Sequence, residues 1–502
     1  MADRENDVLQ TSAHVSTEDG GLRFTYPDPY SGTLFYLQDN ELYGYTPGGV
    51  QVPVFTLENG ILTATVDESG QSRFRQYLSA LDKPFRKLAK LEFLQPDGST
   101  AFTLDNNYRR GWRKKHDTRA FIQDGSLEVS LNNGQRRKAT INLSNVDGAF
   151  SYNVNTLWFG KQVRLSMGLV LPDGTEFYLP QGVFYISNPN ATISPDEKTI
   201  SYDLVDKWSY LDGSLFGTME NTYVVKTESE GSKVNVFNAM RAVLLTNKFT
   251  HGYQSGAAYS SVVDPITPVF PTYYNGRKYA IKGGGYANMT DVPYDITVEA
   301  GKTLADIELE LNNILAGLIG YDMTGALRVE PSETDVSDKD KPVLYAFTPK
   351  NSRFCGMSET AKDEEVYNDV FVVAEGLDGS EIWGRATNMD PQSDTNVNLI
   401  GRKTLYESNG TYYSVAQCAA LAEWELKHKT VLQKSIAIEC QQMFHLVENR
   451  LVSVQRTDKP GNPTEKHIIQ SFSIPIGETG SMTINCTSVN DLPQATITTA
   501  TV

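Results

Sequence analysis

Residues 136–189 read RRKATINLSNVDGAFSYNVNTLWFGKQVRLSMGLVLPDGTEFYLPQGVFYISNP, and their pattern decides the predicted fold. In residues 139–143 every second residue is apolar, which is the period of a half-buried strand. The same alternation returns in residues 163–167. Asp-Gly at 147–148 and Pro-Asp-Gly at 172–174 favour tight reversals of the chain. Short strands separated by such turns predict a small antiparallel β-barrel or sandwich.

The same stretch carries a recognisable set of residues around its turns. They form a Leu-Trp-x-Gly turn and a Pro-x-Gly-x-Phe-Tyr-Ile segment, made by Leu157, Trp158, Gly160, Pro180, Gly182, Phe184, Tyr185 and Ile186. Together with the Pro-Asp-Gly turn, they resemble the first barrel of phage tail hub proteins, also called baseplate hub or tail-associated proteins. The motif is structural, and we expect Trp158 and Tyr185 to pack in the core and at a turn. The resemblance covers most of residues 75–490.

Length and pattern together predict the domain organisation. At about 100–200 residues per domain, 502 residues correspond to three or four domains. The expected fold class is mainly β with α+β elements. We expect an acidic N-terminal extension with short strands at 1–72, a first β-barrel at 73–215, a middle α+β domain at 216–341 with a Tyr- and Gly-rich insertion at 250–288, and a second β-barrel at 342–502. The resemblance implies that the two barrels are related and form a ring.

Apolar residues on one face favour a helix at residues 234–245, and three-and-four spacing predicts two longer helices. The first covers residues 303–320, where Thr303 and Asp306 resemble a capping box and Gly320 ends the pattern. The second covers residues 414–428 inside the second barrel. The order of helix, turn and strand after Thr303 again resembles the tail hub family.

Charge is distributed unevenly along the chain. The formal net charge is −16, whereas a general nucleic-acid binder is usually basic. Residues 1–72 hold eleven acidic against two basic residues, and residues 73–138 hold fifteen basic against seven acidic ones. The basic block predicts either an interface for a partner or a solvated strand face. Its candidate interface residues are Arg109, Arg110, Trp112, Arg113, Lys114, Lys115, Arg136, Arg137 and Lys138.

Cysteine usage and hydropathy exclude several classes of protein. The four cysteines lie far apart without a Cys-x-x-Cys pair, which favours reduced, buried thiols over disulfides or a zinc site. No apolar run reaches the length of a membrane-spanning segment. No pair of histidines has metal-binding spacing, so we expect neither a metal nor a cofactor.

Three short motifs permit a chemical interpretation, and each has a structural alternative that we favour. Gly301-Lys302-Thr303 precedes a helix, but Ile296 stands where a phosphate-binding loop needs glycine, so a helix cap is favoured. Cys440 and His445 are close in sequence, but Cys440 is in phase with an apolar strand, which favours a structural thiol. An oxygen-rich loop favours a solvated crossover over a Ca²⁺ site: Asn388, Asp390, Asp394, Asn396 and Asn398. We therefore assign no catalytic residue and expect no enzyme.

The resemblance implies a structural protein of the virion, located at the tail tip or baseplate and made in the host cytoplasm. Such hubs are trimers whose ring joins the tail tube or distal tail protein above to a central fibre, spike or receptor-binding assembly below. The ring lines the DNA exit channel, so transient contact with DNA is expected during DNA ejection and host cell attachment. The alternative is a cell-wall-degrading or carbohydrate-binding tail-tip protein. Its carbohydrate version rests on the tyrosines of residues 250–288, and a catalytic carboxylate pair stays open because such pairing is spatial.

Overall fold

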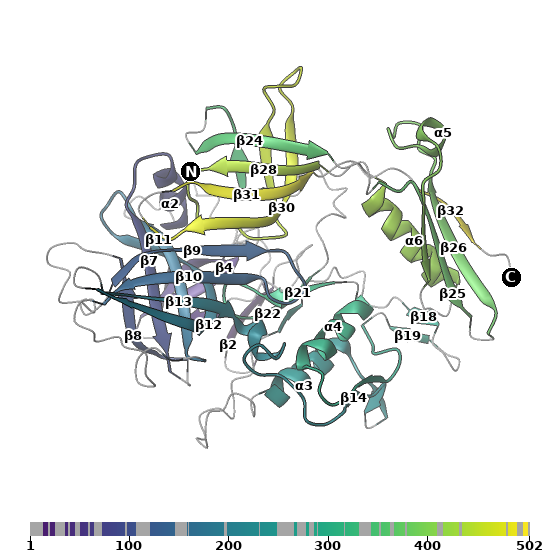
Figure 1. Cartoon of the computed structure of the whole chain (residues 1–502), viewed down its shortest axis with the longest axis horizontal. Helices are drawn as coiled ribbons and strands as arrows, with labels where there is room; N and C mark the ends of the chain where they lie inside the picture. The colour runs from purple at the N-terminus through teal and green to yellow at the C-terminus, as the bar shows by residue number, and fades with distance from the viewer. Residues whose placement is uncertain are drawn as a thin grey trace.

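The structure is a computed structural model of a mainly β chain with a few helices, as the sequence predicts (Figure 1). It describes the chain outside residues 1–13, 19–20, 26–35, 39–40, 46–50, 59–60, 65–72, 96–97, 107–120, 146–157, 159, 195–197, 230, 248–265, 269–277, 281–285, 289, 316, 331–342, 351–352, 362–365, 377–378, 409–414, 431–433, 478–479, 489–494 and 500–502.

The first barrel follows helix α2 (Arg73–Leu81) and is wholly antiparallel. Its strands are β7 (Lys87–Leu94), β8 (Thr100–Asp105), β9 (Phe121–Ser130), β10 (Arg137–Ser144), β11 (Gln162–Val170), β12 (Glu176–Ile193) and β13 (Lys198–Asp206). Neighbouring strands follow the order β9-β10-β13-β12-β11-β7-β8. The predicted alternation is present, because Ala139, Ile141 and Leu143 are buried while Lys138 and Thr140 are exposed. A 3₁₀ turn, η2 (Lys207–Tyr210), ends the barrel.

The second barrel repeats the pairing order of the first. Its strands are β23 (Tyr345–Phe347), β24 (Phe354–Ala361), β28 (Lys434–Cys440), β29 (Leu451–Gln455), β30 (Thr464–Pro475) and β31 (Met482–Ser488). The order β24-β28-β31-β30-β29 matches β9-β10-β13-β12-β11 strand for strand. The two barrels are therefore related in topology, although their sequences are not visibly repeated.

A direct strand pair joins the two barrels. Residues 471–475 of β30 pair antiparallel with residues 126–130 of β9, so both barrels belong to one thirteen-stranded sheet. Their apolar side chains form one continuous core, which includes Leu127 of β9 and Ile474 of β30. In Figure 1 the strands run in a stack from β24 through β30 and β9 to β12.

The middle domain lies between the barrels in sequence and has its own core. It contains β14 (Tyr223–Val225), β15 (Glu228–Ser229), β16 (Ser232–Lys233), α3 (Val236–Asn247), β17 (Ile266–Pro268), β18 (Lys278–Ala280), β19 (Tyr286–Asn288), β20 (Ile296–Val298), α4 (Leu304–Leu315), β21 (Leu318–Tyr321) and β22 (Leu327–Glu330). The predicted capping box of α4 is present: the Thr303 N–H donates to Asp306 Oδ2 at 2.8 Å, and the Asp306 N–H donates to Thr303 Oγ1 at 3.3 Å.

The end of helix α4 differs from the prediction. The helix stops at Leu315, and Leu318–Tyr321 forms strand β21 instead of a last helical turn. The Asn312 side chain donates to the Gly317 carbonyl at 2.7 Å and fixes this exit. A short apolar segment fits both the helical and the strand period, so periodicity alone could not place the boundary.

An α/β unit is inserted within the range expected for the second barrel. It contains β25 (Asp369–Glu375), β26 (Glu381–Asn388), α5 (Val397–Ile400), β27 (Thr404–Ser408), α6 (Val415–Lys429) and β32 (Ala495–Thr499), with strand order β27-β25-β26-β32. Helix α6 covers one face of this sheet and forms a separate core with it. The close approach requires Gly384, because a Cβ there would lie 2.3 Å from the Ala419 nitrogen. Residues 342–502 thus contribute both to the barrel core and to the separate core of this unit.

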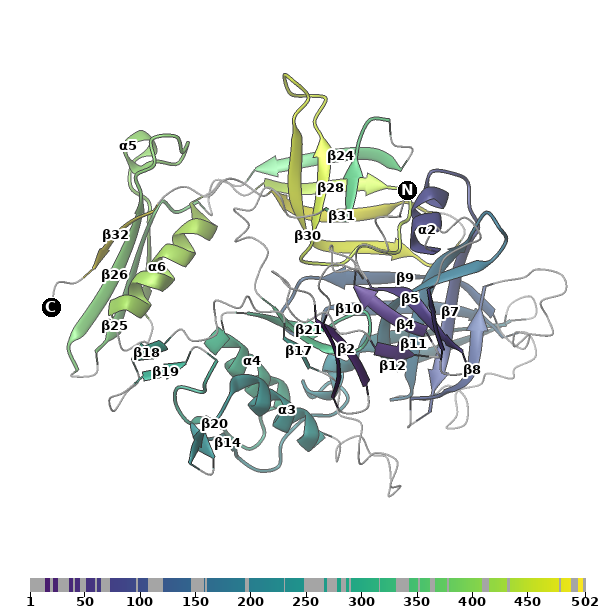
Figure 2. The same ribbon diagram turned by 180° about the vertical axis from the view of Figure 1, so that it is seen from behind.

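Short strands occur in the N-terminal region, as the sequence predicts. A hairpin pairs β1 (His14–Glu18) with β2 (Gly21–Thr25). A second sheet follows the order β3 (Tyr36–Gln38), β4 (Glu41–Tyr45), β5 (Gln51–Glu58) and β6 (Ile61–Ala64). Figure 2 shows β4 and β5 from behind, and β5 contacts helix α2.

Candidate functional site

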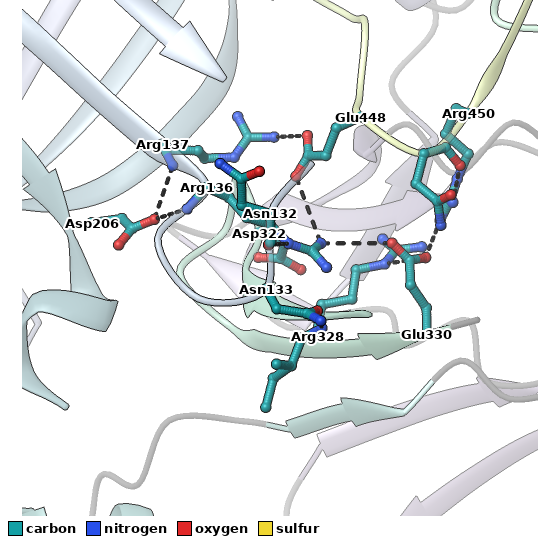
Figure 3. Close-up of polar contacts among 12 residues, drawn as sticks. Asn132, Asn133, Arg136, Arg137, Asp206, Asp322, Arg328, Glu330, Glu448 and Arg450 are labelled. Atoms are coloured by element: carbon teal, nitrogen blue, oxygen red, sulfur yellow. Dashed lines mark hydrogen bonds and ion pairs between the residues drawn. The ribbon is translucent and has the colours of Figure 1, made fainter. Parts of the chain in front are cut away.

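Charged side chains gather in the interior where the first barrel, the middle domain and the second barrel meet (Figure 3). We call this cluster the charged junction and define it by Arg136, Arg137, Asp206, Arg328, Glu330, Glu448 and Arg450. Arg136 ends the turn between β9 and β10, Arg137 begins β10, and Asp206 ends β13. Arg328 and Glu330 lie on β22, whereas Glu448 and Arg450 precede β29. Three parts of the chain therefore supply its charges.

Asp206 fixes the backbone at the start of β10. Its Oδ2 accepts the N–H groups of Arg136 at 2.8 Å and Arg137 at 2.9 Å. Its Oδ1 accepts the Trp208 N–H at 3.1 Å and so caps η2. Burial raises the pKa of Asp206 to about 7, and the backbone donors partly oppose that rise.

Arg137 connects the first barrel to the second. Its Nη2 donates to Glu448 Oε2, and its Nη1 donates to the Gln181 carbonyl at 2.9 Å. The Gln181 side chain in turn donates to the Phe444 carbonyl at 2.8 Å. The side chains of Arg137 and Glu448 are 0% and 2% exposed, so water scarcely weakens this ion pair.

Arg136 lies between two carboxylates from different parts of the chain. Its Nη1 is 3.7 Å from Glu330 Oε1 and 3.9 Å from Glu448 Oε1, and its Nε donates to the Asn132 carbonyl at 3.2 Å. Neither Nη atom makes a hydrogen bond with any residue that the structure describes. Burial lowers the pKa of Arg136, and the charges of Glu330 and Glu448 oppose that change. Arg136 thus depends on charge attraction from both neighbours.

Glu330 joins the middle domain to the second barrel. Its Oε2 accepts from Arg328 Nε at 2.8 Å and from Arg450 Nη2 at 2.9 Å. Arg450 Nη1 also donates to the Asn449 carbonyl at 2.7 Å. Glu330 and Glu448 together face four arginines, so neither carboxylate can be lost without leaving a buried positive charge less compensated.

Backbone contacts hold the middle domain against the turn between β9 and β10. The Gly134 N–H donates to the Ile319 carbonyl at 2.9 Å, and the Ile319 N–H donates to Asn133 Oδ1 at 3.0 Å. Gly320 leaves room for Arg136, because a Cβ there would lie 2.4 Å from Arg136 Nε. Paired charges and close packing make this cluster suited to fixing the relative positions of three units.

The predicted partner interface divides into three groups. Arg109, Arg110, Trp112, Arg113, Lys114 and Lys115 lie outside the described residues. Lys138 is exposed and forms an ion pair with Glu128 at 2.8 Å. Arg136 and Arg137 are 2% and 1% exposed and pair within the chain, so the interface prediction does not hold for these two. The sequence shows that these two residues are charged, but it does not show that they are buried and paired with acidic residues far along the chain.

The described residues of the structural motif occupy buried or half-buried positions. Tyr185 is buried and its ring lies 3.8 Å from that of Tyr210, whose hydroxyl donates to the Gly160 carbonyl at 3.3 Å. Trp158 is half-buried. Leu157 lies outside the described residues, Pro180 is half-buried, Gly182 has φ +153°, and Phe184 and Ile186 are fully buried.

The side chains that the sequence offered for chemistry, Cys440, His445 and Thr303, make structural contacts instead. Burial raises the pKa of Cys440 to about 12 and lowers that of His445 to about 4, which favours a structural thiol over a reactive thiolate. His445 Nδ1 instead lies 3.1 Å from the Tyr77 hydroxyl. Thr303 belongs to the capping box of α4. Among the described residues, no group of three or more His, Cys, Asp or Glu side chains is placed to hold a metal ion.

Side chains of the oxygen-rich loop form hydrogen bonds within the loop and with Thr430. Asn388 Nδ2 lies within hydrogen-bond distance of the hydroxyls of Ser393, Thr395 and Thr430. Asn396 donates to the Asp390 carbonyl at 2.7 Å and caps α5. These contacts stiffen the crossover between β26 and β27.

None of the helices in the described part of the chain has the length and apolar character needed to cross a membrane.

Sequence reasoning missed the acidic half of the charged junction. Arg328 and Glu330 alternate with Leu327 and Val329 in a strand that is buried on both faces. Charged residues within such an apolar strand were the available signal, since buried charges are paired. The identity of the partner was not available, because Glu448 lies 311 positions from Arg137.

Comparison with known proteins finds similarity to solved structures, at low sequence identity. No family model matches the chain, and no curated protein matches it. A tail protein from Neisseria meningitidis is 10% identical, with a TM-score of 0.49 over 80% of this chain and 96% of its own. The 43 kDa tail protein of prophage MuSo2 from Shewanella oneidensis is 12% identical, with a TM-score of 0.45 over 81% and 99%. A prophage tail protein from Listeria monocytogenes is 9% identical, with a TM-score of 0.43 over 81% and 95%.

Proposed function

We propose that this chain is the structural hub protein of a phage tail tip or baseplate and works as a trimeric ring. The observation that carries the proposal is the internal repeat, in which β24-β28-β31-β30-β29 matches β9-β10-β13-β12-β11. A chain with two equivalent barrels presents six of them when three copies surround an axis. Such a ring fits a six-fold tube on one side and three-fold parts on the other.

The tail hub motif at residues 157–186 supports the same assignment, since it lies in the first of the two barrels. In the proposed particle, the ring contacts the tail tube or distal tail protein above and the central fibre, spike or receptor-binding assembly below. Its channel passes DNA during ejection. The protein is made in the host cytoplasm before it enters the virion.

The charged junction would serve this function as a rigid link. Arg137 joins the first barrel to the second through Glu448, and Arg450 joins the second barrel to the middle domain through Glu330. A ring transmits force only if its subunits keep their shape, and these buried pairs resist relative movement of the units. The proposed role involves no catalytic step.

Light scattering of the purified full chain tests the ring. The expected masses are those of one and of three chains, with the trimer favoured as concentration rises. A stable dimer or tetramer would contradict the proposal, because neither gives six equivalent barrels.

A further inference from the structure

Two strand edges of the barrel sheet, one along β24 and one along the C-terminal part of β12, have no partner strand among the described residues. Strand β24 begins the strand order and, among the described strands, pairs with β28. Strand β12 pairs with β11 over residues 176–185 and with β13 over residues 184–193. Residues 188–193 therefore leave the side away from β13 open. Open edges invite pairing with another chain and are usually covered in a native assembly.

The internal repeat assigns a counterpart to each of these edges. Strand β24 corresponds to β9, and β12 corresponds to β30. In the chain itself, β9 and β30 pair with each other across the barrels. The C-terminal half of β30 makes this contact, and the C-terminal half of β12 is the part left open. The chain thus contains a second pair of segments, β24 and the C-terminal half of β12, that is equivalent to the paired segments of β9 and β30.

The match of residues between the two barrels starts from one buried strand pair in each. Ile141 pairs with Tyr202 in the first barrel as Ile438 pairs with Ile484 in the second. Carrying this match along the strands makes Asn190 equivalent to Ser473, since these two face the equivalent residues Ser201 and Thr483. It also makes Thr360 equivalent to Glu128, because Met357 faces Ile438 as Gly125 faces Ile141. Within the chain, Ser473 pairs with Glu128.

We propose that β24 of one copy pairs antiparallel with residues 188–193 of β12 in the next copy, with Thr360 opposite Asn190. This second seam repeats the one between β9 and β30. Alternation of the two seams joins the barrels into a closed ring. The inference rests on the proposed function for its ring of three, while the seam itself follows from the repeat.

Burial at the two seams supports the proposal. Ile476 follows the pairing segment of β30, donates its N–H to the Gly125 carbonyl at 2.8 Å, and is 1% exposed. Its counterpart at the end of β12 is Ile193, which is 80% exposed. That is the largest exposed fraction among the large apolar side chains that the structure describes as exposed. In the proposed seam, Ile193 packs near Met357 of the next copy, as Ile476 does near Gly125.

The first test replaces the exposed apolar residue. Ile193→Asp places a charge in the seam and should shift the monomer–trimer equilibrium toward monomer by at least tenfold in concentration. Leu399→Asp is the matched control, because Leu399 is 69% exposed on α5, away from both edges. Light scattering should show trimers for the control and monomers for Ile193→Asp. Equal assembly of the two variants would overturn the seam.

The second test uses cysteine pairs in a Cys355→Ser background, since Cys355 is an exposed thiol. Thr360→Cys combined with Asn190→Cys should form intermolecular disulfides and yield a covalent ring on a denaturing gel. The control pairs Thr360→Cys with Ala191→Cys, whose side chain points to the opposite face of the sheet. A lack of cross-linking in the first pair, or equal cross-linking in both, would refute the register.

The two proposals can fail separately. Suppose that the wild-type chain forms a trimer, that Ile193→Asp assembles equally well, and that the Thr360→Cys/Asn190→Cys pair does not cross-link. The proposed ring would then stand, and this seam would be rejected. A covalent ring formed by a protein that is missing from tail tips would keep the seam and reject the function in the tail.

Discussion

Replacement of Glu448 by glutamine should destabilise the folded chain strongly. The change keeps the shape of the side chain and removes its charge. Glu448 is 2% exposed on its side chain, binds Arg137 directly and lies 3.9 Å from Arg136 Nη1. After the substitution, two buried guanidinium groups lose a shared counter-charge.

The structure sets the size of this effect. At 3.9 Å, a pair of charges interacts by about 4 kcal/mol if the effective dielectric constant is about 20. Relief of the buried carboxylate offsets part of that loss, and breaking a buried ion pair typically costs about 3–5 kcal/mol. We therefore expect Glu448→Gln to lower the free energy of unfolding by about 3–5 kcal/mol.

Glu128→Gln is the matched control for the same chemical change. Glu128 pairs with Lys138, but their side chains are 49% and 64% exposed. Solvent screening limits that pair to about 0–1 kcal/mol. Guanidinium denaturation, monitored by tryptophan fluorescence, compares both variants with the unchanged chain. The transition that reports unfolding of the barrels is fitted separately, because large chains need not unfold in two states.

The reasoning fails if Glu448→Gln and Glu128→Gln shift the transition equally. A further variant separates loss of the pair from loss of volume. Arg137→Met combined with Glu448→Leu removes both charges and should be more stable than Glu448→Gln alone, because Arg137 is then no longer a buried charge without its partner and Arg136 keeps Glu330. If the double variant is less stable still, the pair contributes by packing and not by charge.

The remaining predictions concern pH and packing at the junction. Burial lowers the pKa of His445 and His467 to about 4, so the unfolded chain binds more protons between about pH 4 and 6.5, and stability should fall as pH drops through that window. Asp206 has the opposite effect, because its raised pKa of about 7 makes stability fall as pH rises from about 4 to 7. Asp206→Asn removes this opposing effect and should therefore steepen the loss of stability on acidification. An unchanged pH profile would show that Asp206 titrates normally. Gly320→Ala should destabilise the junction by about 1–3 kcal/mol, because its Cβ would displace Arg136, and an unchanged melting temperature would mean that the arginine moves freely.

Local patterns in the sequence predicted the local structure well. The alternation at 139–143 predicted β10, and Thr303 with Asp306 predicted the cap of α4. Both signals act within a few residues, so a single stretch of sequence contains them. The predicted packing sites of Trp158 and Tyr185 lie at half-buried and buried positions.

Long-range features were not available in the same way. The seam between β9 and β30 joins residues more than three hundred positions apart, and nothing within either strand encodes that choice. Arg136 and Arg137 were assigned to a surface for the same reason. Their buried ion-pair partners, Glu330 and Glu448, lie far along the chain. The repeat of pairing order became visible only from the topology.

Imaging of the phage particle with this protein labelled tests the central claim most directly. A tag added to an exposed loop, such as the turn at Asp173-Gly174, should appear by electron microscopy at the tail tip. The account predicts three labels around the tail axis, below the last ring of the tube. Labels on the capsid, labels along the tube, or tail tips without any label would contradict it.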